Sequence, residues 1–352
     1  MLKPREAIAS LEPHKSPVIS RSGLNLDLNE NTSGCSPRVL ARIRALSVQN
    51  VSLYPEREAG EQTVARFLGL DPDQILLTNG IDEALLLLFA TYLDSGAEMI
   101  LADPTFVMYT VYGRALGARV VRIKSAQGMH LPTAELLAKI SELTRLIAVA
   151  NPNNPTGMAA PREDLLRILD AAKDAAVLVD EAYFEFGGET LLPEVSTRGN
   201  LFVARTFSKA YGLAGLRLGA LVGPPEQIGY LKRFCSPFNV NGVALACLEE
   251  ALADQAFVTR YIAQVREGRE RLTQLCSELG LHSWPSQTNF VFARVGAGCT
   301  SFAQALGRRG VMVRDMSASP GCDGCVRITI GTPEQITDLT RAMREAMAEL
   351  RP

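Results

Sequence analysis

Short apolar runs alternate with longer segments of helical periodicity along the first two thirds of the chain. The runs are rich in β-branched residues and lie between turn-forming stretches. They predict seven strands, at residues 74–77, 99–102, 120–123, 146–150, 177–180, 201–205 and 218–222. Helical patterns between the strands cover residues 81–92, 109–116 and 162–173. This alternation predicts an α/β fold, in which helices flank a mostly parallel, buried seven-stranded sheet.

The pattern changes after Gly242. Residues 243–279 carry apolar positions at helical spacing with few helix breakers, which predicts a long helical stretch. Strand-like runs and two further helices follow, at residues 289–294, 311–314 and 326–330 and at about 299–309 and 333–351. We expect a smaller α+β domain here. The chain has no repeat and no Gly/Ser linker, so the two domains should be closely coupled.

Three polar segments follow predicted strands of the large sheet. They are Asn151-Pro-Asn-Asn-Pro-Thr-Gly157, Asp180-Glu-Ala-Tyr183 and Thr206 to Gly219. Ligands of a parallel sheet bind beyond the carboxyl ends of its strands, so we expect the three segments to form one site. The last segment holds Lys209 among small and hydroxyl residues, with Arg217 eight positions later.

Together these segments contain the groups that a pyridoxal phosphate (PLP) enzyme needs. Such an enzyme uses an amine for a Schiff base, an acid for the pyridinium nitrogen, donors for the phenolate oxygen and a cradle for the phosphate. Singly, the segments are also typical of a surface lysine, a helix cap and a turn. All three in this order, each after a strand, favour a PLP site.

At these residues the chain resembles the fold type I aminotransferases of class I and II, and within them the histidinol-phosphate aminotransferases. The resemblance also covers residues 28–31, 53–55, 79–83, 103–109, 313–315 and 325–331. It implies ping-pong transfer of an amino group between histidinol phosphate and 2-oxoglutarate, in histidine biosynthesis. An aromatic amino acid aminotransferase and a PLP lyase similar to threonine-phosphate decarboxylase are alternatives on the same frame.

The resemblance also implies catalytic roles for individual residues. Lys209 would carry PLP and, once released, move a proton between the substrate's α-carbon and the cofactor. Asp180 would keep the pyridine nitrogen protonated. Asn154 and Tyr183 would donate hydrogen bonds to the ring oxygen O3′, and Phe106 would stack on the ring.

The phosphate of the cofactor should lie at a helix N-terminus. The predicted helix begins at Ile81 or Asp82, directly after a strand, and backbone N–H groups at such an end favour an anion. Gly80 permits a close approach of the backbone. The third polar segment would complete the cradle with Thr206, Ser208 and Arg217.

Substrate binding and assembly are also implied by the resemblance. Arg327 would bind the substrate carboxylate, and Arg314 with it the phosphate of histidinol phosphate. Asn31 is a further candidate substrate residue. Tyr54, in Leu-Tyr-Pro, would reach the phosphate of a neighbouring subunit, so a homodimer is expected. Where relatives have a Pro-Tyr pair, this chain has Pro13-His14, a departure on the substrate side.

The expected organisation has three parts. Residues 1–30 would pack with the small domain, residues 31–243 would form the large PLP-binding domain, and residues 244–352 the small domain. Small-molecule amino donors and keto acids are the expected partners.

The amino-acid composition limits which kinds of partner, compartment and metal site the protein can have. The 352 residues are 47% hydrophobic and 21% charged, with a net charge of −2, which favours neither nucleic acid nor a membrane as partner. No apolar run reaches the length of a membrane span. The odd cysteine count, seven, indicates a reducing cytoplasm. Cys322 and Cys325 have the spacing of a redox or metal pair, but no second pair or nearby histidine completes a zinc site, and no metal is expected.

Overall fold

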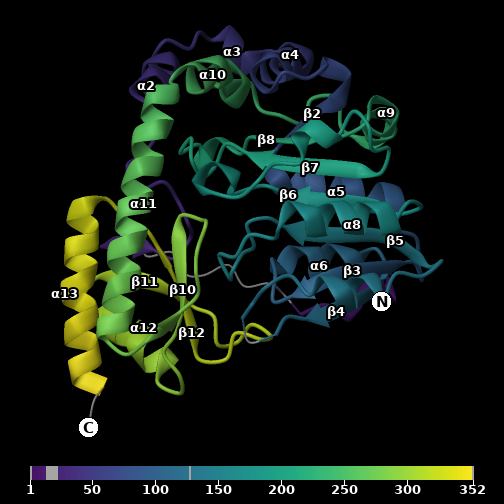
Figure 1. Cartoon of the computed structure of the whole chain (residues 1–352). Coiled ribbons are helices and arrows are strands. Elements are labelled where there is room, and N and C mark those ends of the chain that lie inside the picture. The colour runs from purple at the N-terminus through teal and green to yellow at the C-terminus, as the bar shows by residue number, and fades with distance from the viewer. Residues whose placement is uncertain (1, 13–22, 127, 351–352) are drawn as a thin grey trace.

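The computed structural model describes residues 2–12, 23–126 and 128–350. Within these residues the strands form two sheets, one of seven strands and one of five. Figure 1 shows the larger sheet with its helices at the right and the smaller sheet at the lower left, beside the C-terminal helix.

The larger sheet confirms the predicted α/β fold. Strand β8 (Gly219–Val222) is antiparallel to both of its neighbours, and all other neighbouring pairs are parallel. The spatial order is β2 (Ile75–Thr78), β8, β7 (Leu201–Thr206), β6 (Ala176–Asp180), β5 (Thr144–Ala150), β3 (Glu98–Asp103) and β4 (Arg119–Lys124). Each strand overlaps a predicted run.

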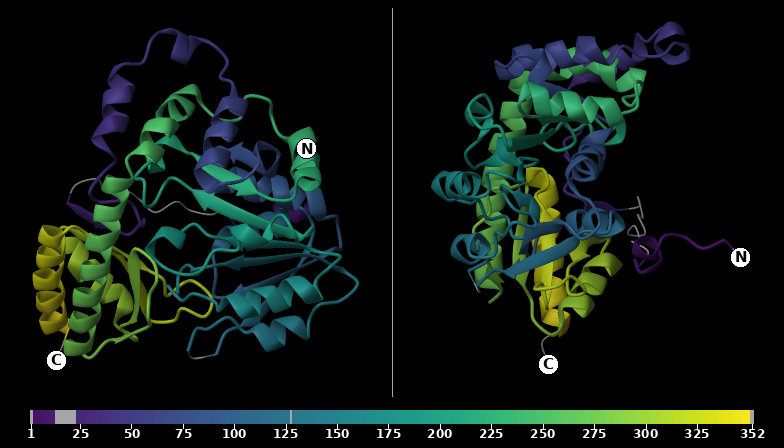
Figure 2. Two further views of the ribbon diagram at one scale, coloured as in Figure 1. Left: turned by 45° about the horizontal axis from the view of Figure 1, so that its top comes forward. Right: turned by 90° about the vertical axis from the view of Figure 1, so that its right-hand side faces the viewer.

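Helices cover both faces of this sheet (Figures 1 and 2). Val177 and Val179 of β6 pack in the same apolar cluster as Leu165 of α8 (Arg162–Ala171). Leu178, between them, packs in the cluster of α5 (Gly80–Tyr92) and α6 (Val107–Ala115). Successive side chains of a strand point to opposite faces, so a strand covered on both sides is a continuous apolar run.

One edge of the sheet collects the ends of its parallel strands. Strands β3, β5, β6 and β7 end there, and the antiparallel β8 begins there, with Gly219 opposite both Thr78 and Thr206. All three polar segments of the sequence follow strands that end at this edge. The sheet therefore brings together residues that are far apart along the chain.

The smaller sheet joins an early segment to the C-terminal third. Strand β1 (Leu24–Leu26) runs parallel to β11 (Val311–Asp315), and the other pairs are antiparallel. The order continues from β11 to β12 (Cys325–Thr329), β10 (Phe290–Arg294) and β9 (His282–Ser283). The predicted runs match β10, β11 and β12, whereas β1 and β9 are too short to show a pattern.

The helical prediction for residues 243–279 is wrong at one point. The structure has two helices there, α10 (Gly242–Ala253) and α11 (Gln255–Glu278). Asp254 separates them, because its carboxylate accepts a hydrogen bond from the backbone N–H of Phe257 at 3.2 Å, as an N-cap residue does, and another from Ser36. Helix α10 packs against α2 (Pro37–Arg44), and α11 continues to the smaller sheet (Figure 1).

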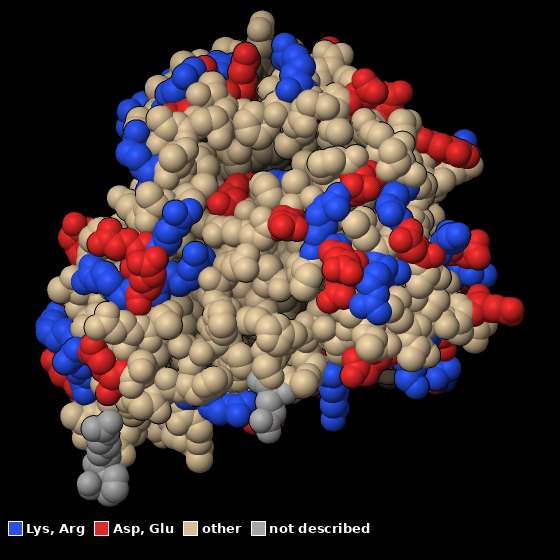
Figure 3. Space-filling model, viewed as in Figure 1, with Lys and Arg blue, Asp and Glu red and all other residues tan. Residues whose placement is uncertain are grey.

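The remaining helices complete the outer surface. They are α1 (Glu6–Ala9), α3 (Gln49–Ser52), α4 (Arg57–Leu68), α7 (Thr133–Leu137), α9 (Pro225–Phe234), α12 (Cys299–Arg308) and α13 (Pro333–Leu350). No helix among the described residues has both the length and the apolar character needed to cross a bilayer. On the face shown in Figure 3, basic and acidic side chains are interspersed.

Candidate active site

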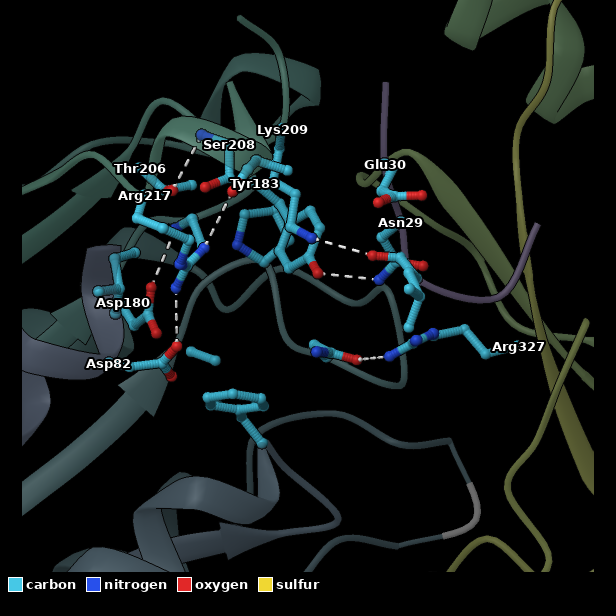
Figure 4. Close-up of a pocket in the computed structure, with 18 of the residues that line it drawn as sticks. Asn29, Glu30, Asp82, Asp180, Tyr183, Thr206, Ser208, Lys209, Arg217 and Arg327 are labelled. Carbon is cyan, nitrogen blue, oxygen red and sulfur yellow. Dashed lines mark hydrogen bonds and ion pairs between the residues drawn. The ribbon is translucent and has the colours of Figure 1, made fainter. Parts of the chain in front are cut away.

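A cavity of about 480 Å³ lies where the carboxyl edge of the large sheet faces the smaller sheet. One wall comes from the strand ends of the large sheet, and the other from residues 28–30 and Arg327 (Figure 4). Most of the predicted site residues line it: Ile81, Asp82, Phe106, Asn154, Asp180, Tyr183, Thr206, Ser208, Lys209, Arg217 and Arg327.

Lys209 presents a buried amine to this cavity. It follows the end of β7, and its Nζ donates a hydrogen bond to the carbonyl oxygen of Leu28 at 3.1 Å. Burial lowers the pKa of Lys209 from 10.5 to about 8, and the nearby positive charges of Arg327 and Arg217 act in the same direction. A substantial fraction of the amine is therefore neutral, and so nucleophilic and basic, near physiological pH.

Asp180 lies at the end of β6 and has two well-defined donors. The hydroxyl of Tyr109 donates to its Oδ2 at 2.6 Å, and the backbone N–H of Ala182 donates to its Oδ1 at 3.0 Å. Burial raises the pKa of Asp180 to about 6, although both hydrogen bonds oppose this shift. The neighbouring Glu181 does not line the cavity and is paired with Arg205 at 2.7 Å.

Two polar side chains of the large-sheet wall are held by the opposite wall. Arg327 Nη1 donates to Asn154 Oδ1 at 2.7 Å, so this amide has its NH2 group to offer a ligand. Asn29 Nδ2 donates to the hydroxyl oxygen of Tyr183 at 2.8 Å, and this hydroxyl still has its own proton to donate. Both groups are thereby oriented as donors toward the cavity.

An anion cradle is built at the start of α5. Gly80 has a φ of +75°, which favours glycine, and its lack of a side chain leaves room for the Arg217 guanidinium, whose Nη2 would lie 2.6 Å from a Cβ there. Arg217 is paired with Asp82 at 3.0 Å. The hydroxyl oxygen of Thr206 accepts from the backbone N–H of Ser208 at 3.1 Å, which shapes the loop that faces the helix. Helix N–H groups, hydroxyls and a guanidinium together are suited to a phosphate.

Comparison with known proteins agrees with this geometry. The family model described as aminotransferase class I and II matches residues 21–343. The chain belongs to the class I and II aminotransferases. It is 36% identical to histidinol-phosphate aminotransferase 1 of Bacillus cereus over 333 residues, which cover 93% of this chain and 89% of that protein. It is 32% identical to histidinol-phosphate aminotransferase 1 of Trichormus variabilis over 345 residues, 97% of each.

A solved structure extends the similarity to three dimensions. Histidinol-phosphate aminotransferase from Sinorhizobium meliloti, in complex with pyridoxal-5′-phosphate, superposes with a TM-score of 0.91 at 27% sequence identity. The match covers 100% of this chain and 99% of that one. The chain is therefore an aminotransferase with the full architecture of this class, and its substrates are small amino compounds.

Four predicted residues of this aminotransferase do not line the cavity. Asn31 is buried beside it, where its Nδ2 donates to the carbonyl oxygen of Ala210 at 3.0 Å and so holds the Lys209 loop. Arg314 lies opposite Arg327 in the antiparallel pair of β11 and β12.

Tyr54 is 79% exposed and stacks on Phe238. The fourth, Gly80, lies against the Arg217 guanidinium at the start of α5. His14 lies outside the described residues.

Two residues of the site have no role in the sequence-based prediction. Tyr109 follows Phe106 by three positions on α6, and the two rings meet edge to face at 5.6 Å. Helical spacing therefore provides a signal for Tyr109, because residues three apart lie on one helix face. The contact of Asn29 with Tyr183 depends on β1 joining the other strands of the smaller sheet. A strand of three residues gives no sequence signal for this pairing.

Proposed function

We propose that this aminotransferase is PLP-dependent and transfers an amino group between histidinol phosphate and 2-oxoglutarate. Its relatives are named histidinol-phosphate aminotransferases. The observation that carries the proposal is that one cavity is lined by the buried Lys209 amine, the Asp180 carboxylate and an anion cradle. The similarity over nearly the whole length of the histidinol-phosphate aminotransferases supports the choice of substrate.

The residues present fit the cofactor. The space that a side chain at position 80 would need is taken by the Arg217 guanidinium, which supports a phosphate site at this helix end. Asp180 suits a protonated ring nitrogen, and Asn154 and Tyr183 suit an anionic ring oxygen. Phe106 lines the cavity and offers an apolar face for a ring.

The side chains then have separate tasks in the reaction. Bound PLP would supply an aldehyde that condenses with amines and a ring that withdraws electrons from the substrate's α-carbon. The Asp180 carboxylate would hold a proton on the ring nitrogen, and Tyr109 would hold this carboxylate in place. The Lys209 amine, with its pKa lowered to about 8, would take the proton from the substrate's α-carbon and deliver it to the aldehyde-derived carbon of the cofactor.

Two arginines support a substrate with a carboxylate or a phosphate. Arg314 and Arg327 are direct partners in an antiparallel pair, so their side chains leave the sheet on the same face. Arg327 lines the cavity, and its Nη2 donates to the carbonyl oxygen of Asp27 at 2.7 Å. We assign the carboxylate of glutamate to Arg327, and the phosphate of histidinol phosphate to Arg327 together with Arg314.

We also infer a homodimer and a division into domains. Tyr54 and Phe238 are both exposed, with ring centroids 4.4 Å apart, and the apolar side chains Val48, Val51 and Leu53 are exposed nearby along the chain. An exposed apolar group of this size is typical of an interface, and a second copy of the chain is the occupant we propose. The pairing of β1 with β11 supports a small domain of residues 244–352 that includes residues 1–30.

Seven free cysteines within the described residues support a reducing compartment such as the cytoplasm.

A substrate panel tests the proposed reaction. The purified, PLP-loaded protein is incubated with 2-oxoglutarate and with histidinol phosphate, phenylalanine or tyrosine, and glutamate formation is measured. We expect histidinol phosphate to be the best donor. A preference for the aromatic amino acids would favour an aromatic aminotransferase, and release of carbon dioxide from a phosphorylated amino acid would indicate a lyase.

Mixing two inactive variants tests the dimer. If Tyr54 acts on the neighbouring subunit's site, Tyr54→Ala and Lys209→Ala subunits should together form one intact site in each mixed dimer. We expect activity to reappear after subunit exchange, provided that Tyr54→Ala alone is impaired. No recovery, in a mixture shown by mass to contain heterodimers, would place Tyr54 in its own subunit's site or outside both.

A further inference from the structure

A short loop between α9 and α10, residues 235–241, contacts both halves of the anion cradle. One half is the start of α5, which follows β2. The Asn239 amide nitrogen donates to the carbonyl oxygen of Leu77 in β2 at 3.0 Å and to Glu83 Oε2 in the first turn of α5 at 2.6 Å. Glu83 Oε2 also accepts from the backbone N–H of Asn79 at 2.6 Å. Asn239 therefore connects the strand and the helix on either side of Gly80.

The other half of the cradle is the Arg217 segment, and Asn241 holds it. The Asn241 amide nitrogen donates to the carbonyl oxygen of Leu216, the residue before Arg217, at 2.9 Å. The amide oxygen of Asn241 accepts from the backbone N–H of Ala244 at 2.8 Å and so caps α10. Arg217 itself has a left-handed backbone with a φ of +54°, which is costly for a residue other than glycine. A backbone of this kind persists only where its surroundings hold it.

Buried charges fix the loop from behind. Arg57, which is 7% exposed, donates from Nη1 to Asn239 Oδ1 at 2.9 Å and pairs through Nε with Glu61 at 3.1 Å. Glu61 Oε1 accepts from the backbone N–H of Leu77 at 3.2 Å, and Lys232 pairs with Glu61 at 2.9 Å. Leu77 is thus held through both of its backbone polar groups by side chains.

One ordinary explanation is that these side chains cover a sheet edge. Strand β2 is the edge strand of the larger sheet, and unpaired backbone groups at an edge need partners. This explanation accounts for Leu77. It does not account for the bond from Asn241 to Leu216, because that residue precedes β8 in the turn that carries Arg217.

We propose that Asn239 and Asn241 are positioning residues, which hold the α5 N-terminus and Arg217 in register so that the cradle binds the phosphate of the cofactor. The proposal rests on the proposed function, since it presumes a phosphate in the cradle. The Arg217 guanidinium lies directly against Gly80, so its position relative to the α5 N-terminus depends on where the two backbone segments are held. Sites of this kind must hold their geometry within about 0.5 Å to work well.

The most selective variant is Asn241→Asp. A carboxylate keeps the oxygen that caps α10, because aspartate and asparagine are equally good caps, but it has no N–H for Leu216. Asn239→Asp similarly keeps an acceptor for Arg57 but loses both donors, and it places a second carboxylate beside Glu83. Asn200→Asp is the matched control, since Asn200 Nδ2 also donates to two backbone carbonyls, those of Leu169 and Ala172, at the far end of β7.

The measurement is the affinity of the cofactor-free protein for PLP and for pyridoxal, which lacks the phosphate. Loss of one net hydrogen bond corresponds to about a fivefold change, so we expect PLP binding to weaken about fivefold in Asn241→Asp and by more in Asn239→Asp. Pyridoxal binding should change less than about twofold, so the ratio of the two affinities falls. The Asn200→Asp protein should keep the wild-type ratio even if its melting temperature drops.

Four outcomes oppose the proposal. An unchanged PLP affinity in Asn241→Asp would overturn it, since this variant keeps its helix cap and is expected to fold. Equal losses for PLP and pyridoxal would show that the loop supports only the general fold. If the wild-type protein binds pyridoxal and PLP equally, the cradle holds no phosphate, and if it binds neither, the proposed function fails as well.

Discussion

The two walls of the cavity are built in different ways. On the wall from the larger sheet, Asp180 and Lys209 follow neighbouring parallel strands, and Asp180 is held by Tyr109, which contacts the same sheet. On the other wall, Arg327 bonds to the backbone of Asp27, 300 residues away along the chain. The position of Asp180 on the first wall depends on one sheet alone, whereas the second wall requires two distant segments to meet. We expect the first wall to determine the chemistry and the second to determine which substrate is accepted.

The strongest test removes the amine of the large-sheet wall. Lys209→Ala should reduce turnover by at least about 10⁴-fold, because both the covalent attachment and the proton transfer are lost. The cradle should still retain some PLP. Borohydride reduction of the wild-type holoenzyme, followed by peptide mapping, should find the pyridoxyl group on Lys209. A label on another lysine would show that the chemistry lies elsewhere.

A milder change on the same wall keeps its shape. Asp180→Asn should leave PLP bound but slow the reaction by about 10³-fold, since an amide does not stabilise a charge on the ring nitrogen. All donors should be affected to a similar extent, because they share the cofactor. Single-turnover rates with histidinol phosphate and with glutamate provide the measurement. Near-normal rates would show that the Asp180 carboxylate does not act on the ring nitrogen.

Substitutions on the opposite wall should instead change kcat/KM to different extents for different substrates. Arg314→Ala should lower kcat/KM for histidinol phosphate by at least about 30-fold, the effect of removing one partner of a charge-assisted contact, and should change phenylalanine or tyrosine far less. Arg327→Ala should also impair glutamate. Arg309→Ala, which removes ion pairs with the exposed Glu345 and Glu349, is the control. Equal losses for phosphorylated and unphosphorylated donors in Arg314→Ala would contradict the assigned role.

The smallest expected effect concerns the support of Asp180. The Tyr109 hydroxyl lowers the pKa of this carboxyl group, so Tyr109→Phe should raise the pKa above its present value of about 6. The reactive carboxylate is then lost at a higher pH as the solution is acidified. We expect the acidic limb of the kcat/KM profile to move to higher pH, with a loss of about tenfold near neutrality. Tyr92→Phe, which removes a hydroxyl bonded to Gln227, should leave the profile unchanged.

The same contrast explains what the sequence could predict. All seven strands of the larger sheet were predictable from their apolar runs. Strands inside the sheet are buried on both faces and are nearly continuous apolar runs, whereas the partly buried edge strand β4 still keeps Val120, Val121 and Ile123. The residues at the carboxyl edge of this sheet follow its strands directly, so their meeting was predictable too. The break at Asp254 was not predicted, because helical periodicity continues through it. Its carboxylate caps α11 through the backbone N–H of Phe257 and also accepts from Ser36, which is distant along the chain. The sequence-based prediction chose Asn31 and not Asn29 as a site residue, because nothing in the local sequence shows which of the two faces Tyr183.

The glycines of the cradle limit how this enzyme can change over time. A Cβ on Gly219 would lie 2.9 Å from the backbone carbon of Gly80, and one on Gly80 would lie against Arg217. Neither glycine therefore has room for a side chain while its neighbours keep their places. Accepted mutations should be almost absent at this corner, even in laboratory evolution toward a new amino donor. New specificity should instead arise at Arg314, to which we assign the phosphate of the substrate.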